Sequence, residues 1–201
     1  PIEFVMRSYM TGRTQTSIWQ NYNAGVRNYC GHQLRDGYRK NDKLDKVLLT
    51  PTTKSDEHDE LLSEQEILDQ KLLTKEQWET CKNYAYALFE FGQKTCAERG
   101  LILVDTKYEF GFDEEGIIRL IDEVHTPDSS RYWISHNYLV RHNSNQQPDN
   151  IDKEFIRRYV KSTYKDPYDE NTTINIPSEQ IDILSKRYLL LHKLITGNDF
   201  R

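Results

Sequence analysis

Two β-rich runs on either side of a short turn constrain the fold more than any other feature of this sequence. The runs are LILVDTKYEF at 101–110 and IIRLIDEV at 117–124, and GFDEEG at 111–116 joins them. Branched and aromatic residues flanking a glycine-containing turn are typical of a β-hairpin. The chain is therefore expected to contain antiparallel sheet.

Capping patterns predict two helices before this hairpin. Ser63 with Glu66 matches a capping box that opens a short helix, and Thr74 with Gln77 matches a second one. The second helix is expected to end at Gly100 and to pack beneath a sheet, with its cysteines in the core. Its apolar positions have helical spacing: Trp78, Cys81, Ala85, Leu88, Gly92 and Cys96.

The remaining segments are assigned more coarsely. Residues 2–10 predict a strand that ends at the turn Thr11-Gly12, and residues 20–60 predict long loops with one short helix. A polar loop is expected at 142–150, with helices from about residue 152 and over 178–196. The predicted fold class is α+β, with an antiparallel sheet packed against helices.

Composition excludes several classes of protein. The 201 residues suffice for one domain, or for one domain plus a small appendage. A net charge of -5 argues against sequence-independent nucleic-acid binding, and a mean hydropathy of -0.83 without a long apolar run argues against a membrane span. Three cysteines without CxxC spacing argue against a zinc site or a disulfide framework and predict a cytoplasmic protein.

Charged residues alternate along the first strand of the hairpin. Asp105, Lys107 and Glu109 are expected on one face, because side chains alternate along a strand. A favourable register brings Asp122 to the same face, which gathers three carboxylates around one ammonium and suits Mg²⁺. The alternative is a solvated sheet face with cross-strand ion pairs.

The loop DEVHTPDSSR at 122–131 is a second candidate site. Hydroxyls and the guanidinium of Arg131 are suited to holding a phosphate, although the loop taken alone is explained better by a capped turn before an aromatic anchor at 132–133. Arg7, on the first strand, is open to a ligand role, but an arginine within a strand more often extends to the surface or forms an ion pair there.

Several motifs, in order, resemble one family, phosphoribosylaminoimidazole-succinocarboxamide synthase (SAICAR synthetase). The hairpin motifs are LILVDTKYEFG at 101–111 and LIDEVHTPDSSRYW at 120–133. PIEFVMRSYMTG at 1–12, TPTTK and HDE within 50–60, and SKRYLLLHKLITG at 185–197 extend the resemblance over nearly the whole chain. The fold implied is the family's larger domain, which is related to ATP-grasp proteins.

The resemblance implies an ATP- and Mg²⁺-dependent ligase of purine biosynthesis. Such an enzyme joins the carboxylate of phosphoribosyl carboxyaminoimidazole to the amine of L-aspartate through an acyl phosphate. Glu109 and Asp122 would hold Mg²⁺, Lys107 would neutralise the reacting groups, and Asp105 would lie close by as an acid/base group or through water. The substrate-binding residues implied are Arg7, Arg131 and Ser130 for the phosphate, and Lys54, His58 and Asp59 for the imidazole or aspartate.

The resemblance also predicts what this chain lacks. Residues 1–201 are expected to form the larger domain with its C-terminal helices, and a nucleotide-binding lobe is expected before residue 1. Arg13 stands where many family members have serine. The small-molecule substrates are the expected partners, and a homo-oligomer stays open. Two alternatives remain: a non-catalytic nucleotide- or metabolite-binding module on the same scaffold, and a kinase-like phosphotransferase.

Overall fold

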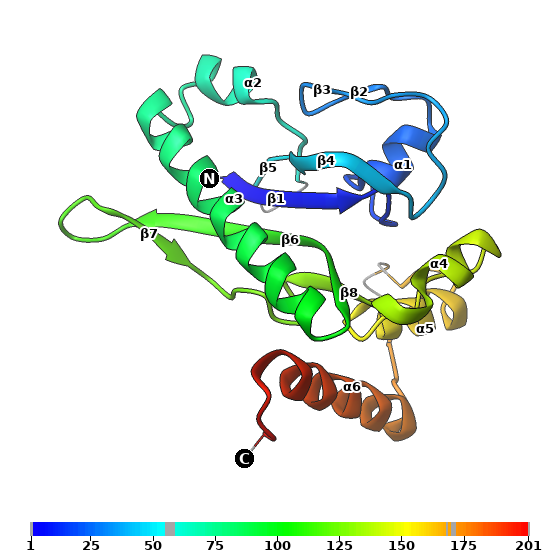
Figure 1. Cartoon of the computed structure of the whole chain (residues 1–201). Coiled ribbons are helices and arrows are strands. Elements are labelled where there is room, and N and C mark those ends of the chain that lie inside the picture. The colour runs from blue at the N-terminus through cyan, green and yellow to red at the C-terminus, as the bar shows by residue number, and fades with distance from the viewer. Residues whose placement is uncertain (1, 55–58, 168, 170–171, 201) are drawn as a thin grey trace.

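The centre of the molecule is an antiparallel sheet of six strands (Figure 1). The computed structural model describes residues 2–54, 59–167, 169 and 172–200. The strands are β1 (Ile2–Tyr9), β4 (Lys43–Leu49), β5 (Thr52–Thr53), β6 (Leu101–Phe112), β7 (Ile118–Ile121) and β8 (Ser130–Ile134). A separate ribbon pairs β2 (Asn28–Tyr29) with β3 (His32–Gln33).

The long strand β6 organises this sheet because it pairs with three others. One edge of β6 bonds to β1, and the other bonds first to β8 and then to β7. Leu103 lies opposite Tyr132 and Asp105 lies opposite Arg131, so β6 has one extra residue at this point. A bulge of this kind changes which face of the sheet the following side chains occupy.

The effect of the bulge is visible in the packing. Before it, Leu101 and Leu103 lie in the main core, and after it Tyr108 does so. Asp105 and Lys107 lie on the opposite face, across from β1 residues that also face away from the core. The odd-numbered positions of β6 therefore pass from core to cleft within one strand.

Six helices surround the sheet in the described part of the chain. They are α1 (Ile18–Asn23), α2 (Glu64–Asp69), α3 (Lys75–Glu98), α4 (Ser135–Asn143), α5 (Glu154–Thr163) and α6 (Ser178–Thr196). None of these described helices is long and apolar enough to cross a membrane.

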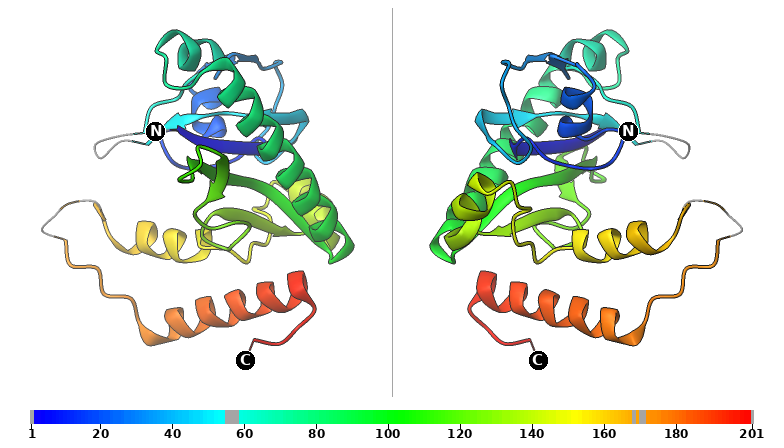
Figure 2. Two further views of the ribbon diagram at one scale, coloured as in Figure 1. Left: turned by 90° about the vertical axis from the view of Figure 1, so that its left-hand side faces the viewer. Right: turned by 90° about the vertical axis from the view of Figure 1, so that its right-hand side faces the viewer.

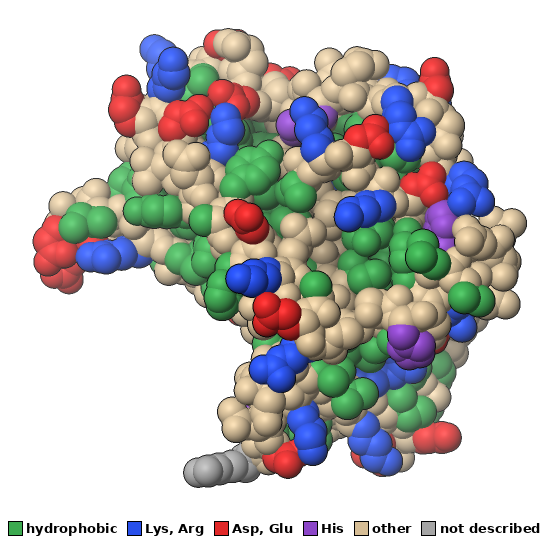
Figure 3. Space-filling view, in the orientation of Figure 1, with side chains coloured by type: hydrophobic (Ala, Val, Ile, Leu, Met, Phe, Trp, Pro, Cys, Tyr) green, Lys and Arg blue, Asp and Glu red, His purple; other side chains and the backbone are tan. Residues whose placement is uncertain are grey.

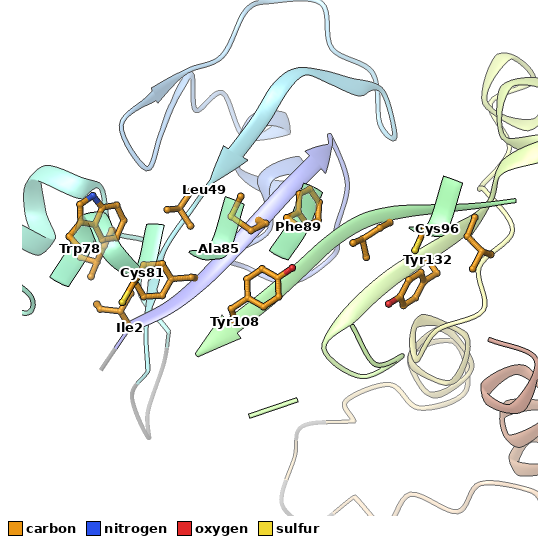
Figure 4. Close-up of a cluster of buried hydrophobic side chains, with 14 of the residues drawn as sticks. Ile2, Leu49, Trp78, Cys81, Ala85, Phe89, Cys96, Tyr108 and Tyr132 are labelled. Atoms are coloured by element: carbon orange, nitrogen blue, oxygen red, sulfur yellow. The ribbon is translucent and has the colours of Figure 1, made fainter. Parts of the chain in front are cut away.

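Helix α3 covers one face of the sheet and supplies much of the core (Figure 4). Thr74 and Gln77 form a reciprocal capping box at its start, and Gly100 adopts a left-handed φ of 72° after its end. The buried residues of α3 are Trp78, Cys81, Ala85, Phe89, Gly92 and Cys96. Phe4 of β1 stacks on Trp78, with ring centroids 5.4 Å apart.

Helices α5 and α6 lie side by side at the end of the molecule farthest from α2 (Figure 2). Leu191 is buried in the main core. The Arg187 guanidinium donates to the carbonyl oxygen of Asn150 at 2.7 Å, and the Tyr188 hydroxyl donates to Asp128 Oδ1 at 2.7 Å. These contacts attach the last helix to the loops of the central sheet.

The β6–β7 hairpin projects from the body and carries apolar side chains along its length (Figure 3). Its exposed apolar residues are Phe112, Ile117, Leu120 and Ile121.

The fold class, the first strand, the hairpin, both capping boxes and the two C-terminal helices are confirmed. The prediction for 20–60 is wrong in part, because β4 and β5 of this region join the main sheet. Only three of the seven side chains of β4 are buried, so its sequence lacks the regular alternation of apolar and polar residues that predicts a strand. The polar loop predicted at 142–150 also begins too early, since α4 continues to Asn143, and β8 was not predicted.

Phe89 and Phe91 give a matched test of this packing. Phe89 is 1% exposed in the core, whereas Phe91 is 67% exposed on the same helix. Phe89→Ala is expected to lower the free energy of unfolding by about 3–5 kcal/mol. Phe91→Ala should change it by about 0.5 kcal/mol or less. Urea unfolding measures both, and equal losses would contradict the placement of α3.

Candidate functional site

An open cleft of about 260 Å³ lies on the face of the sheet opposite α3. Strands β1 and β6, the loop before β8 and the start of α5 contribute its walls. Its lining includes Glu3, Asp59, Asp105, Lys107, Ser129, Ser130, Arg131, Asp152, Lys153, Glu154 and Arg157. Five of the predicted site residues thus line one cavity: Asp59, Asp105, Lys107, Ser130 and Arg131.

Lys107 lies at the centre of a carboxylate cluster. Its Nζ is 2.6 Å from Glu109 Oε1, 3.0 Å from Glu3 Oε1 and 3.2 Å from Asp122 Oδ2. Burial disfavours the charged ammonium, but the hydrogen bonds to Glu109 and Glu3 outweigh it and raise the pKa of Lys107. The prediction of three carboxylates around one ammonium is right in number, but the third is Glu3 rather than Asp105.

Asp122 reaches this cluster by leaving the strand. The residue opposite Glu109 is Ile121, where β7 ends, and Asp122 adopts a left-handed φ of 64°. The backbone N–H of Glu123 and the ammonium of Lys107 lower the pKa of the Asp122 carboxyl. Continued pairing would place Asp122 opposite Tyr108, on the core face, so the turn is what brings the carboxylate to Lys107.

Asp105 binds two arginines from the neighbouring strands. Arg7 Nη1 lies 3.8 Å from Asp105 Oδ2, and Arg131 Nη1 forms a closer ion pair with the same oxygen. Arg7 also donates through Nε to Thr50 Oγ1 at 2.9 Å and is 7% exposed. The structure thus places Arg7 behind Asp105 and not among the described residues that line the cleft.

Arg131 also borders a basic pocket beside the cleft. Arg13, Lys40 and Arg158 line that pocket, and Glu154 is the carboxylate among them. Arg13 Nε lies 3.2 Å from Glu154 Oε1. Burial and the charge of Arg13 lower the pKa of Lys40. A concentration of cations around one carboxylate gives a positive potential that attracts anions.

Sequence reasoning did not assign Lys40, Arg158 or Glu154 to the site. Lys40 lies in a turn without periodicity, and only tertiary packing brings it to Arg131. Helix α5 is placed by Asp152, which is 1% exposed and accepts hydrogen bonds from the backbone N–H groups of Tyr132 and Glu154 at 2.7 and 2.8 Å. Burial raises the pKa of Asp152, while Arg131 lowers it.

The remaining predicted residues occupy the rim or the floor. Lys54 forms an ion pair with Glu109 from an exposed position, and Asp59 is exposed at the edge of the cleft. His58 lies outside the described residues. Ser130 is buried, and its Oγ lies 2.7 Å from Thr106 Oγ1. Its hydroxyl is therefore already engaged in a contact between β6 and β8.

The donors at Lys107 fit a magnesium ion by their chemistry. Carboxylate oxygens of Glu109 and Asp122 lie within 3.2 Å of one ammonium nitrogen, so the two can approach a common cation. No group of three His, Cys, Asp or Glu side chains suited to a metal occurs among the residues described. Mg²⁺ typically takes one or two carboxylates and completes its shell with water and phosphate.

His125 lies in the loop between β7 and β8, with its ring against Gly92 of α3. The Tyr108 hydroxyl lies 2.5 Å from its Nε2, and the Tyr132 hydroxyl donates to its carbonyl oxygen. Burial among these neutral groups lowers the pKa of the imidazole to about 4. The ring is therefore neutral near pH 7.

Comparison with known proteins gives the family of this fold and cleft. The family model described as SAICAR synthetase matches residues 1–174. Phosphoribosylaminoimidazole-succinocarboxamide synthase from Legionella pneumophila (strain Paris) is 48% identical over 200 residues, which cover 100% of this chain and 64% of that protein. The chain belongs to the SAICAR synthetase family and spans about two thirds or less of its relatives' length.

Solved structures have the same fold. SAICAR synthase from Saccharomyces cerevisiae complexed with SAICAR superposes with a TM-score of 0.77 at 26% identity, over 100% of this chain and 61% of that chain. A SAICAR synthetase in complex with ADP superposes with a TM-score of 0.64 at 22% identity, over 100% of this chain and 65% of that chain. The α+β prediction thus corresponds to the fold of this family.

The pKa of His125 predicts how stability depends on pH. Its folded-state value of about 4 lies below the ordinary 6.5, so the unfolded chain binds more protons between these values. The free energy of unfolding should therefore fall by about 3 kcal/mol from this group as pH drops from 6.5 to 4. His125→Gln should flatten that slope.

Urea unfolding at several pH values between 4 and 7 measures the slope. His136→Gln is the control, because His136 is exposed. An unchanged slope in the His125 variant would contradict the burial of a neutral imidazole.

Proposed function

We propose that the protein carrying this chain is an ATP- and Mg²⁺-dependent ligase. It joins the carboxylate of phosphoribosyl carboxyaminoimidazole to the amine of L-aspartate in purine biosynthesis. The observation that carries the proposal is the cleft itself, where Arg131 beside a basic pocket lies at one end and the Lys107 cluster at the other. Membership of the SAICAR synthetase family supports the reaction.

The basic pocket is proposed to hold the substrate's phosphate. Arg131 supplies a planar guanidinium that matches phosphate geometry, and Lys40 and Arg158 add charge. Ser130 would share this role by donating its hydroxyl hydrogen to a phosphate oxygen while its oxygen accepts from the Thr106 hydroxyl. Arg7 would act through Asp105 unless its side chain leaves that carboxylate. Anchoring a remote phosphate orients the reacting carboxylate without touching it.

The Lys107 cluster is proposed as the reaction centre. Glu109 and Asp122 would hold Mg²⁺, which offsets charge on the transferred phosphoryl group when bound. Lys107 then lies where its ammonium can neutralise the substrate carboxylate, and Asp105 lies on the next cleft-facing position of β6 as an acid/base group or through water. Lys54 and Asp59 at the rim, with His58, would contact the imidazole or aspartate.

The chemistry follows from the poor reactivity of a carboxylate. Transfer of the ATP γ-phosphoryl group to a carboxylate oxygen gives an acyl phosphate and ADP. The neutral amine of aspartate then attacks the carbonyl carbon, the C–O bond to phosphate breaks, and the amine loses a proton as the amide forms. Positioning and charge stabilisation are what the protein contributes to such a transfer.

Nucleotide binding, location and domain role extend the proposal. The solved relative in complex with ADP supports use of ATP. The chain contains no glycine-rich phosphate loop, so we propose that it supplies the substrate-binding larger domain. Free cysteines, two of them buried, support a reducing cytoplasmic location.

The test is ADP release by the natural protein that carries this sequence, with and without L-aspartate. Release that requires aspartate supports the ligase. Release without aspartate supports the kinase-like alternative, and no release with ATP, Mg²⁺ and both substrates supports the non-catalytic module. The last two outcomes overturn the proposal.

Asp122→Asn should remove Mg²⁺-dependent turnover, because the amide is a weaker ligand for a hard cation. Its side chain is 41% exposed, so the melting temperature should stay nearly unchanged. Glu114→Gln, at the exposed turn of the same hairpin, is the control. Full activity of Asp122→Asn would remove this residue from the metal site.

Lys40→Ala should weaken binding of the phosphate-bearing substrate without lowering the free energy of unfolding. The neighbouring cations repel Lys40, so its removal should leave the free energy of unfolding equal or higher. The KM for the phosphate-bearing substrate should rise by about tenfold or more, the value of one charged hydrogen bond. Lys43→Ala, at an exposed position, should change neither quantity. An unchanged KM for Lys40→Ala would exclude the basic pocket as the phosphate site.

A further inference from the structure

Gly92 occupies an unusual place in the middle of the long helix α3. Glycine inside a helix is destabilising relative to alanine, so a packing reason is expected. A Cβ here would lie 2.5 Å from His125 Cε1 and 2.8 Å from Leu103 Cδ2. Both distances are well inside ordinary carbon contact of about 3.5–4.0 Å. The glycine thus leaves a notch in α3 that the His125 ring fills.

Two tyrosines fix the same histidine from the sheet. Tyr108 of β6 reaches the ring Nε2 at 2.5 Å, and Tyr132 of β8 binds the backbone carbonyl. Both tyrosines are buried in the layer that also contains Phe89 and Cys96 (Figure 4). His125 is therefore held on its ring and on its backbone at once.

The backbone from Asp122 to His125 has an uncommon conformation. Asp122 and His125 both have left-handed φ values, 64° and 55°, a conformation that is uncommon for residues with a Cβ, although Asp and His adopt it more often than most. Val124 packs against the main core between them. Contacts with other parts of the molecule therefore help to hold the segment from Asp122 to His125 in this conformation.

A compact turn connects His125 to the phosphate end of the cleft. Thr126 Oγ1 accepts from the N–H of Ser129 at 3.2 Å, and the carbonyl oxygen of Thr126 accepts from the N–H of Ser130 at 3.0 Å. Ser130 then binds Thr106 and is followed by Arg131. This turn directly follows His125 and is also joined to β6, where the N–H of Lys107 donates to the carbonyl oxygen of Ser129 at 3.2 Å.

We propose that His125, seated in the notch left by Gly92 and held by Tyr108, is a positioning residue that sets the placement of Asp122 and of Ser129–Arg131 together. The hydrogen bond of the ring is to Tyr108, which is not among the residues proposed to meet the substrates, so the ring acts through the loop. This inference rests on the proposed function for its catalytic consequence, whereas its structural part can be tested without activity.

A double-mutant cycle tests the seat of the ring. His125→Ala removes the anchor, and Gly92→Ala pushes the ring out of its notch, so each is expected to speed hydrogen exchange of the Ser129 and Ser130 amides. The double variant should exchange no faster than His125→Ala alone, because the ring that the added methyl would displace is then absent, and the remaining close contact is the end of the Leu103 side chain at 2.8 Å. Unchanged loop exchange in either single variant, or additive effects in the double, would overturn the proposal.

Kinetics of the natural protein distinguish positioning from stability. His125→Ala should raise both the KM for the phosphate-bearing substrate and the Mg²⁺ concentration for half-maximal activity by about tenfold or more. Tyr108→Phe keeps the aromatic ring of residue 108 and removes its hydroxyl. It should raise the KM and the Mg²⁺ concentration for half-maximal activity by less than His125→Ala does. Cys81→Ala is the control, since it thins the core on the same helix away from the loop.

The outcomes separate this inference from the proposed function. Unchanged KM and Mg²⁺ dependence in His125→Ala, with aspartate-dependent turnover in the parent protein, would overturn the positioning role alone. A parent protein that releases no ADP would overturn the proposed function, and the exchange cycle would still decide whether His125 places the loop.

Discussion

The extra residue in β6 is the constraint on which the site depends. In an unbroken strand Leu101, Leu103, Asp105 and Lys107 would share a face, and either the leucines would be exposed or the charges buried in the core. The bulge between Leu103 and Asp105 resolves this conflict by sending the leucines to α3 and the charges to the cleft. One strand thereby serves as the centre of the core and as the floor of the site.

Buried charge is tolerated at this floor because every group has a partner. Asp105 is 8% exposed and lies between Arg7 and Arg131, and Glu109 is 6% exposed between Lys54 and Lys107. Removing one member of a buried pair leaves an uncompensated charge, which costs about 3–5 kcal/mol. A shift in strand register would separate Asp105 from Arg7 and Arg131 at a similar cost, so these pairs favour the observed register. The basic pocket is the exception, since Arg131 pairs with Asp105 and Arg13 with Glu154, which leaves the charges of Lys40 and Arg158 for an anionic ligand to balance.

Local signals in the sequence predicted a large part of this arrangement. Capping boxes at Ser63 and Thr74 fixed two helix starts, and alternation in the hairpin placed Asp105, Lys107 and Glu109. What failed depends on contacts between distant segments. No pattern in the sequence indicates the bulge in β6. Glu3 reaches Lys107 only through the pairing of β1 with β6. The first residues of β8 belong to a segment that was interpreted as a polar loop. The seat of His125 on Gly92 is likewise a property of helix and sheet together.

The two charged ends of the cleft are proposed to belong to one ligand site. A crystal structure of this chain soaked with SAICAR, the ligand of the Saccharomyces cerevisiae relative, tests it most directly. The account predicts the phosphate among Arg131, Lys40 and Arg158, with the heterocycle directed toward Lys107. A phosphate bound away from Arg131, or a heterocycle directed away from the Lys107 cluster, would contradict it.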